Sequence, residues 1–229
     1  MKRTNENYQI KGIKEQLINT GGLLEKEGVA IIVNYFVERK SKDTFELSWA
    51  SNKETHHATG DDLLSIEQYL EIYKLRLFHL MLKDGSLIRF NFVFKKGRLA
   101  TQNLLWWPCP LSGFEANRST LDEVELLMEL LEGKLEKEDL IMRSPIRIDF
   151  DISKETEKHP LYHMHIENCD TRIAINEPLC INGFLRFILS NFYPDIELKY
   201  SEWNYINLKN EDSNFMYNDS LKISRINIL

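Results

Sequence analysis

Alternation of apolar and polar residues between Ser144 and Asn176 is the feature that most constrains what this 229-residue chain folds into. The alternating runs are I-R-I-D-F-D at 146–151, Y-H-M-H-I at 162–166 and R-I-A-I at 172–175. A side-chain period of two is that of a β-strand with one buried face. The runs therefore predict three short strands whose apolar residues enter a core and whose polar residues share the opposite face.

Those polar positions bring together the side chains of a candidate site. In a hairpin centred near residue 156, Asp149 faces His163 and Arg147 faces His165, and a next turn centred between residues 168 and 169 sets His165 opposite Arg172. Directly opposed residues lie about 5 Å apart at Cβ, close enough to hydrogen-bond or to share a metal ion. The candidate catalytic or metal-binding residues are Asp149, Asp151, His163 and His165. The candidate phosphate-binding residues are Arg147 and Arg172.

Two interpretations of this polar face are open. Carboxylate and imidazole ligands suit a divalent ion such as Zn, Mn or Fe, and a nearby arginine stabilises phosphate charge, as in a nuclease or phosphoesterase. Alternatively, these residues are the ordinary polar face of an antiparallel sheet, stabilised by opposite charges across its strands. A second nuclease hint is Glu197-x-Lys199 after Asp195, which matches a common strand motif of restriction-type nucleases.

Two short turns predict further antiparallel pairs. Asp84-Gly85 favours a type I′ turn, because both residues tolerate positive φ. Lys96-Gly97 predicts the next turn along the chain. The runs that these turns join, which we expect to form one antiparallel meander, are 76–83, 86–94 and 98–107.

Helical spacing and end signals predict several helices around that sheet. Gly21 and Gly22 are expected to end the first helix, and Ser65 with Gln68 forms a capping box that begins the second. Pro194 ends the last helix. We expect helices at 6–19, 65–74, 120–133 and 181–192, a further hairpin from 29–37 to 44–50, and a weakly patterned tail over 195–229.

These elements place the chain in the α+β class, with a mostly antiparallel sheet and helices packed on it. In the 181–192 helix the apolar spacing predicts four side chains buried on the sheet, namely Phe184, Phe187, Ile188 and Phe192. The length suits a single domain over 1–229, in which 1–60 and 195–229 extend a central region.

Composition and charge narrow the class of protein. A hydrophobic content of 43% with 28% charged residues predicts a packed core rather than disorder. The formal net charge of -6 does not favour a general nucleic-acid binder. The cysteines lack C-x-x-C spacing, the N-terminal stretch is polar, and no apolar run has membrane-spanning length. We therefore expect reduced thiols, no signal peptide, no membrane partner and a cytoplasmic location.

A series of motifs resembles a known family. They are D-G-S-L-I-R-F at 84–90, L-L-W-W-P-C-P at 104–110, R-I-D-F-D at 147–151, H-P-L-Y-H-M-H-I at 159–166, C-D-T-R-I-A-I at 169–175 and F-L-R-F-I-L-S-N-F-Y-P at 184–194. Their order resembles a bacterial family catalogued as domain of unknown function 2290, over roughly Ser65 to Pro194. The resemblance implies an uncharacterised bacterial protein from a phage-defence or mobile-element gene cluster.

The leading functional hypothesis is therefore a binding or interaction component whose partner is another protein of the same operon. The alternative is a metal-dependent nuclease or phosphoesterase built on Asp149, Asp151, His163 and His165. A concave pocket lined by these side chains would favour the enzyme, whereas a buried web of ion pairs would favour the binding protein. The substrate and the oligomeric state do not follow from the sequence.

Overall fold

A computed structural model describes residues 4–49, 65–110, 141, 143–153, 156, 159–167 and 170–208, with side chains from residue 8 onward. Its longer elements, in chain order, are α1 (Thr4–Lys26), β1 (Ala30–Val33), β2 (Val37–Lys40), β3 (Thr44–Ser48), α2 (Ile66–Lys74), β4 (Leu80–Leu82), β5 (Leu87–Lys95), β6 (Arg98–Trp107), β7 (Ile146–Asp151), β8 (Tyr162–Ile166), β9 (Ile173–Ala174) and α4 (Ile181–Phe192), before a 3-10 turn at Tyr200–Glu202. The expected helix at 120–133 and the end of the tail after residue 208 lie outside the described residues.

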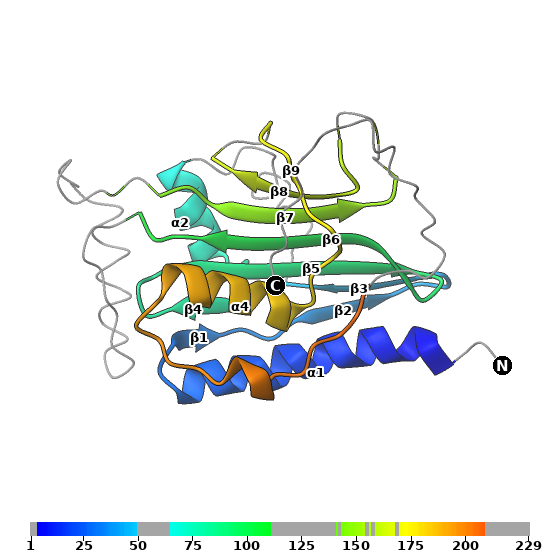
Figure 1. Cartoon of the computed structure of the whole chain (residues 1–229), viewed down its shortest axis with the longest axis horizontal. Helices are drawn as coiled ribbons and strands as arrows, with labels where there is room; N and C mark the ends of the chain where they lie inside the picture. Colours follow the sequence, from blue (N-terminus) through cyan, green and yellow to red (C-terminus); the bar gives the residue numbers. More distant parts are fainter. Residues whose placement is uncertain are drawn as a thin grey trace.

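The strands of the described part form one antiparallel sheet in the order β1-β4-β5-β6-β7-β8-β9. Along one edge of β5, β4 pairs with its first half and β3 pairs with its second half, and β2 lies outside β3. Figure 1 shows α1 and α4 on the near side of this sheet and α2 on the far side. The predicted α+β class is confirmed.

His79 supplies a hydrogen-bond acceptor to β5 at the position where the neighbouring strand changes from β4 to β3. On the edge that β3 and β4 share, β5 has no strand beside Phe90, and the Phe90 backbone N–H donates to Nδ1 of His79 at 3.1 Å. This bond requires an unprotonated Nδ1. Burial lowers the pKa of His79 to about 3, so the ring stays neutral. His79 is thus a buried residue whose Nδ1 has a backbone partner.

The predicted meander of three strands is confirmed, but the type I′ turn at Asp84-Gly85 is wrong. Gly85 has a φ of 79°, whereas Asp84 does not have a positive φ. The Gly85 N–H donates to the Leu82 carbonyl at 2.9 Å, and the Leu82 N–H donates to the Ser86 carbonyl at 2.8 Å, which closes a three-residue loop. Asp84 accepts from the Ser86 N–H through its side chain, so it stabilises the loop without left-handed backbone.

Two consecutive positive φ values occur instead at the turn between β5 and β6. Lys96 and Gly97 have φ values of 52° and 76°, and they join the paired residues Lys95 and Arg98. This is the pattern of a type I′ hairpin, whose twist matches that of the flanking strands.

The run 29–37 is not one strand. It is divided at Asn34, whose side-chain Nδ2 donates to the Phe78 carbonyl at 2.9 Å and whose backbone N–H donates to the His79 carbonyl at 2.8 Å. The part before this break, β1, pairs with β4, and the part after it, β2, pairs with β3. The expected hairpin with 44–50 is thus correct only for β2.

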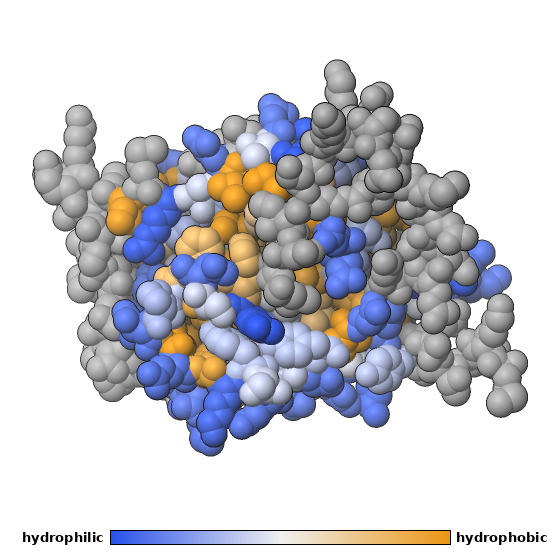
Figure 2. All heavy atoms as spheres, in the orientation of Figure 1, coloured by the Kyte–Doolittle hydropathy of each residue, from blue (hydrophilic) through white to orange (hydrophobic). Residues whose placement is uncertain are grey.

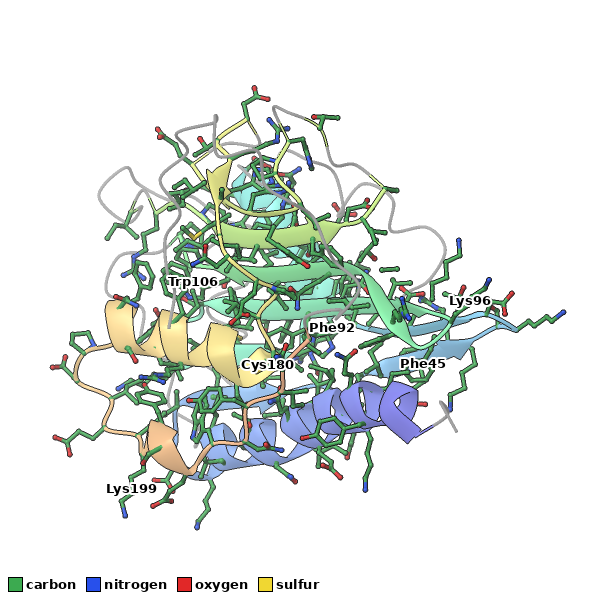
Figure 3. The ribbon with its side chains drawn as sticks, turned by 45° about the vertical axis from the view of Figure 1, so that its right-hand side comes forward. Phe45, Phe92, Lys96, Trp106, Cys180 and Lys199 are labelled. Carbon is green, nitrogen blue, oxygen red and sulfur yellow. The ribbon has the colours of Figure 1, made fainter. Side chains whose placement is uncertain are left out.

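The sheet has a hydrophobic core on each side. The larger core lies under α1 and α4 and takes the even-numbered residues of the central strands, such as Phe90, Leu104 and Ile148. Figure 3 shows Trp106 and Cys180, both members of this core, on the side that α4 covers. The smaller core lies under α2 and includes Leu105 and Trp107. The central strands are therefore covered on both faces.

The last helix begins and ends where the sequence predicts, at Ile181 and Phe192. Phe184 and Ile188 are fully buried, as expected, and Phe187 is partly buried. The expectation for Phe192 is wrong, because 43% of its surface is exposed. Its ring packs against Trp106 with a centroid distance of 4.5 Å, at the edge of the core rather than within it.

The first helix continues through the two glycines that were expected to end it. Gly21 and Gly22 lie inside α1, which ends at Lys26. A Cβ at Gly21 would lie 3.3 Å from Cγ1 of Val33, so the missing side chain lets α1 approach β1 closely. Figure 2 shows mostly hydrophilic residues along the edge of the molecule where α1 lies, and Ile13 and Leu24 of α1 are fully buried, whereas Ile18 is exposed.

The different burial of two phenylalanines on α4 predicts different costs of truncation. Phe184→Ala removes a fully buried ring and should lower the free energy of unfolding by about 3–5 kcal/mol. Phe192→Ala removes a ring that is 43% exposed and should cost clearly less. Urea unfolding of the two variants measures the difference, and equal losses would contradict this packing of α4.

The buried neutral ring of His79 predicts that stability falls on acidification. Its pKa is about 3 in the folded chain and 6.5 ordinarily, so between these values only the unfolded chain gains this proton. The free energy of unfolding should therefore be unaffected by His79 above that ordinary value, and below it should fall by about 1.4 kcal/mol per pH unit.

His79→Gln tests this prediction, since glutamine supplies an acceptor for the Phe90 N–H but does not titrate. Urea unfolding between about pH 7 and about pH 4 should give a shallower slope for the variant. The slopes are compared rather than the absolute stabilities, and identical slopes would show that His79 is not the titrating group.

Candidate functional site

Four neighbouring strands, β6 to β9, position a group of polar side chains on the face of the sheet opposite α1 and α4. β7 and β8 pair in the predicted register, with Asp149 opposite His163 and Arg147 opposite His165. β6 pairs on the other side of β7 and sets Asn103 opposite Asp149. His163 pairs with Ala174 on β9, so the same register places residue 172 beside His165, as predicted. We call Asn103, Arg147, Asp149, His163 and His165 the polar cluster.

Asp149 is the centre of the polar cluster. Its Oδ1 accepts a hydrogen bond of 2.6 Å from Nδ2 of Asn103. Its Oδ2 lies 2.8 Å from Nε of Arg147 and 3.2 Å from Nε2 of His165. Burial alone raises the pKa of Asp149, but the bond from His165 and the charge of Arg147 outweigh it and hold the pKa below its ordinary value. The carboxylate is therefore ionised at neutral pH.

His163 has one occupied ring nitrogen and one unoccupied one. Nδ1 lies 2.7 Å from the Pro160 carbonyl oxygen, which only accepts, so Nδ1 carries the hydrogen. Nε2 then presents a lone pair, and it is buried without a hydrogen-bond partner among the described residues. Burial, aided by the neighbouring His165, lowers the pKa of His163 to about 4. A neutral imidazole with a free lone pair is the form that binds a metal ion.

These properties make three members of the polar cluster a candidate metal site. Ligand atoms of Asp149, His163 and His165 all lie within 4.8 Å of one another. The two imidazoles are nearly inaccessible, with 1% of His163 and 6% of His165 exposed. The imidazoles are therefore shielded from solvent, whereas 20% of the Asp149 side chain is exposed.

Two polar residues of this face, Arg89 and Asn103, were not foreseen from the sequence. Arg89 on β5 is buried, and its Cζ lies 4.2 Å from the centre of the Trp49 ring. Burial, with the charge of Arg147, lowers the pKa of Arg89 to about 10, so the guanidinium remains charged at neutral pH. Sequence analysis missed Arg89, although it alternates with apolar residues on its strand, and it missed Asn103, which follows Thr101 and Gln102 and shows no such alternation.

Two other predicted site residues have contacts of their own outside the polar cluster. Asp151 accepts hydrogen bonds from N and Oγ of Ser153, at 2.9 and 2.6 Å, and is not part of the three-residue ligand group. Arg172 contacts the Asp170 carbonyl at 3.4 Å, in the turn before β9. The E-x-K triplet at 197–199 does not lie on a strand, which removes the restriction-nuclease interpretation of that triplet. Cys169, His56 and His57 lie outside the described residues.

The contacts of Asp149 predict a specific pattern in a double-mutant cycle. Asp149→Ala leaves Arg147 without this carboxylate and should lower the free energy of unfolding by about 3 kcal/mol. Arg147→Met in that background should recover part of the loss, because both partners are then removed. The exposed pair Arg39–Glu46 is the control, and Glu46→Ala should cost less than about 1 kcal/mol.

Denaturant unfolding of the single and double variants measures this coupling. An Asp149→Ala variant as stable as the parent protein would show that the cluster contributes nothing to folding.

Among known proteins, one family resembles this chain. The sequence profile of one family, described as "Uncharacterized conserved protein (DUF2290)", matches residues 30–228, a range that contains all strands of the sheet and the polar cluster. Neither the curated proteins nor the solved structures give a match. No helix in the described ranges is both long and apolar enough to cross a membrane. The chain belongs to the DUF2290 family of uncharacterised conserved proteins.

Proposed function

We propose that this protein is a binding protein in which Asp149, His163 and His165 hold a divalent metal ion. One observation carries the proposal. The bond from Nδ1 of His163 to the Pro160 carbonyl leaves Nε2 as a buried lone pair within the three-residue ligand group. Metal-ligating histidines commonly donate their other ring N–H to a backbone carbonyl, which fixes the tautomer and the ring orientation. Two imidazoles and one carboxylate suit Zn²⁺ or Mn²⁺.

The burial of the ligands favours binding over catalysis. With 1% of His163 and 6% of His165 exposed, a substrate as large as a nucleotide does not reach their ring nitrogens. An ion held there would instead join β7 to β8 and stiffen this side of the sheet. Asp149 can keep its bonds to Asn103 and Arg147 while it binds an ion, because a carboxylate has about four acceptor positions.

The second candidate function is a metal-dependent nuclease or phosphoesterase at the same site. The position of Arg147 favours it, since its Nε lies 2.8 Å from the Asp149 carboxylate, beside the candidate ion. A guanidinium next to a metal ion stabilises the charge that develops on a transferring phosphoryl group.

The cellular setting of the proposal comes from the family resemblance alone. We propose a bacterial cytoplasmic protein that binds another protein of its own operon, in a phage-defence or mobile-element gene cluster. The formal net charge of -6 does not favour nucleic acid as the partner.

The metal proposal predicts about one equivalent of a transition metal per chain after purification without chelator. Elemental analysis and calorimetric titration with Zn²⁺ and Mn²⁺ measure this stoichiometry. His163→Ala should weaken binding at least tenfold, since it removes a ligand. His159→Gln is the matched control, because the His159 ring lies 4.5 Å from the His163 ring but is outside the ligand group.

The outcomes separate the two candidate functions. Metal binding without hydrolysis supports the binding protein. Metal-dependent hydrolysis of bis(p-nitrophenyl) phosphate or of DNA, lost in His163→Ala and kept in His159→Gln, would establish the enzyme instead. If neither Zn²⁺ nor Mn²⁺ binds, the cluster is a web of ion pairs within the sheet and both metal-based functions are excluded.

A further inference from the structure

Two large apolar side chains are exposed where α1 meets the β1–β2 connection. Tyr35 is 93% exposed and Ile18 is 62% exposed, and both line the same cavity, so they are neighbours. Exposed apolar side chains that lie together, rather than singly, mark an interaction surface. We propose that a second copy of this chain covers them, in a symmetric dimer whose two α1 helices pack antiparallel.

This surface is separate from the candidate metal site. The cavity beside Ile18 and Tyr35 is also lined by Phe90 and Leu185 of the larger core, which lies on the sheet face opposite the polar cluster. Figure 1 shows α1 along one edge of the molecule, and the Lys11 side chain of this helix is 75% exposed. The dimer therefore does not depend on a bound metal ion.

The outer side of α1 carries one stripe of neighbouring residues. Residues 11, 15, 18, 22 and 25 follow one another at spacings of three and four, so they lie on one face of the helix. Lys11, Glu15, Ile18 and Gly22 are exposed, and Glu25 is partly buried. We call these five residues the outer stripe. It has an apolar residue at its centre and charges of both signs toward its ends.

Gly22 indicates a close neighbour on the outer stripe. A glycine inside a helix costs about 1 kcal/mol relative to alanine, so it calls for a reason. Gly21 has one within the chain, since a Cβ there would lie 3.3 Å from Cγ1 of Val33. A Cβ at Gly22 would meet nothing within 4 Å. Close approach of a second helix, whose distance depends on the side chains at the contact, supplies the reason for Gly22.

The charges of the outer stripe match those of a second copy. Lys11 and Glu25 stand seven residues before and seven residues after Ile18, which is close to two helical turns. In an antiparallel pair with its two-fold axis at Ile18, Lys11 lies opposite Glu25 of the partner subunit, and the same ion pair forms on both sides of the axis. A parallel pair would instead set Lys11 against Lys11 of the partner subunit. The charges thus select the antiparallel arrangement, and the apolar Ile18 side chains meet at its centre.

The same mixture of charges argues against other occupants. A lipid surface binds basic polar faces, and a nucleic acid requires clustered lysine or arginine. The outer stripe has two glutamates and one lysine, which suits neither. Lys11 has an ion pair within the chain, with Oε1 of Glu15 at 3.6 Å from Nζ, and both side chains remain exposed. Such a pair contributes little to stability, so Lys11 is available to a second copy.

Sedimentation equilibrium of the full chain tests the dimer at low ionic strength, where exposed charges are least screened. The parent protein should dimerise with a Kd below about 100 μM. Lys11→Glu and Glu25→Lys should each weaken dimerisation about tenfold, because each sets like charges opposite one another on both sides of the axis. An equimolar mixture of the two variants should dimerise again, because opposite charges then face each other at both positions.

Ile18→Ala should also weaken dimerisation about tenfold, since it removes apolar surface at the axis from both copies. Leu75→Ala is the matched control and should leave the equilibrium unchanged, because Leu75 is 50% exposed at the end of α2, on the far side of the sheet. Thermal unfolding should show every variant folded, since substitutions at the surface change stability little.

Each outcome decides the proposal. A parent protein that shows no dimer at about 100 μM overturns it. A dimer that Ile18→Ala leaves unchanged overturns it too, because the copies then meet through another surface. If the two charge variants are each weakened but their mixture does not dimerise again, each effect arises within its own chain, and the antiparallel pairing of α1 is overturned.

Discussion

The hydrogen bond from the Phe90 N–H to His79 satisfies the edge of β5 between its two partner strands, β3 and β4. β5 has β3 beside one half and β4 beside the other, and a backbone donor left between them would be buried without a partner. Nδ1 of His79 stays unprotonated and accepts the hydrogen bond from this donor. β5 thereby continues unbroken from its pair with β4 to its pair with β3, and its other edge pairs with β6, which carries Asn103 of the polar cluster.

The two faces of the sheet meet different physical demands. On the face of α1 and α4, burial of aromatic and aliphatic side chains supplies most of the stabilisation. On the other face, a buried carboxylate needs partners, and Asp149 has three of them in Asn103, Arg147 and His165. The same surroundings that ionise Asp149 also keep His163 neutral. An ionised group beside a group that is kept neutral, both with shifted pKa values, is typical of ion-binding and catalytic sites, and also of structural ion-pair networks.

Signals carried by a few adjacent residues were sufficient to predict much of the fold. The capping box at Ser65, the 181–192 helix and the Asp149–His163 register all follow from local patterns. Asn103 could not be placed from sequence, because the pairing of β6 with β7 joins segments separated by 38 residues that carry no pairing signal. The predicted end of the first helix at Gly21 and Gly22 was wrong for a related reason. A sequence shows that glycine destabilises a helix locally, but it does not show the close approach of α1 to β1 that offsets this cost.

The packing of α1 against the end of the described chain has a consequence for synthesis. Gln16 donates to the carbonyl of a residue 188 positions later, and Gly12 lies directly against Ile206. At translation rates of about 5–20 residues per second, α1 waits roughly 10–40 s on the ribosome for these partners. Throughout that interval the part of α1 that contacts residues 204–206 lacks these partners, so it is open to chaperones and to aggregation until they emerge.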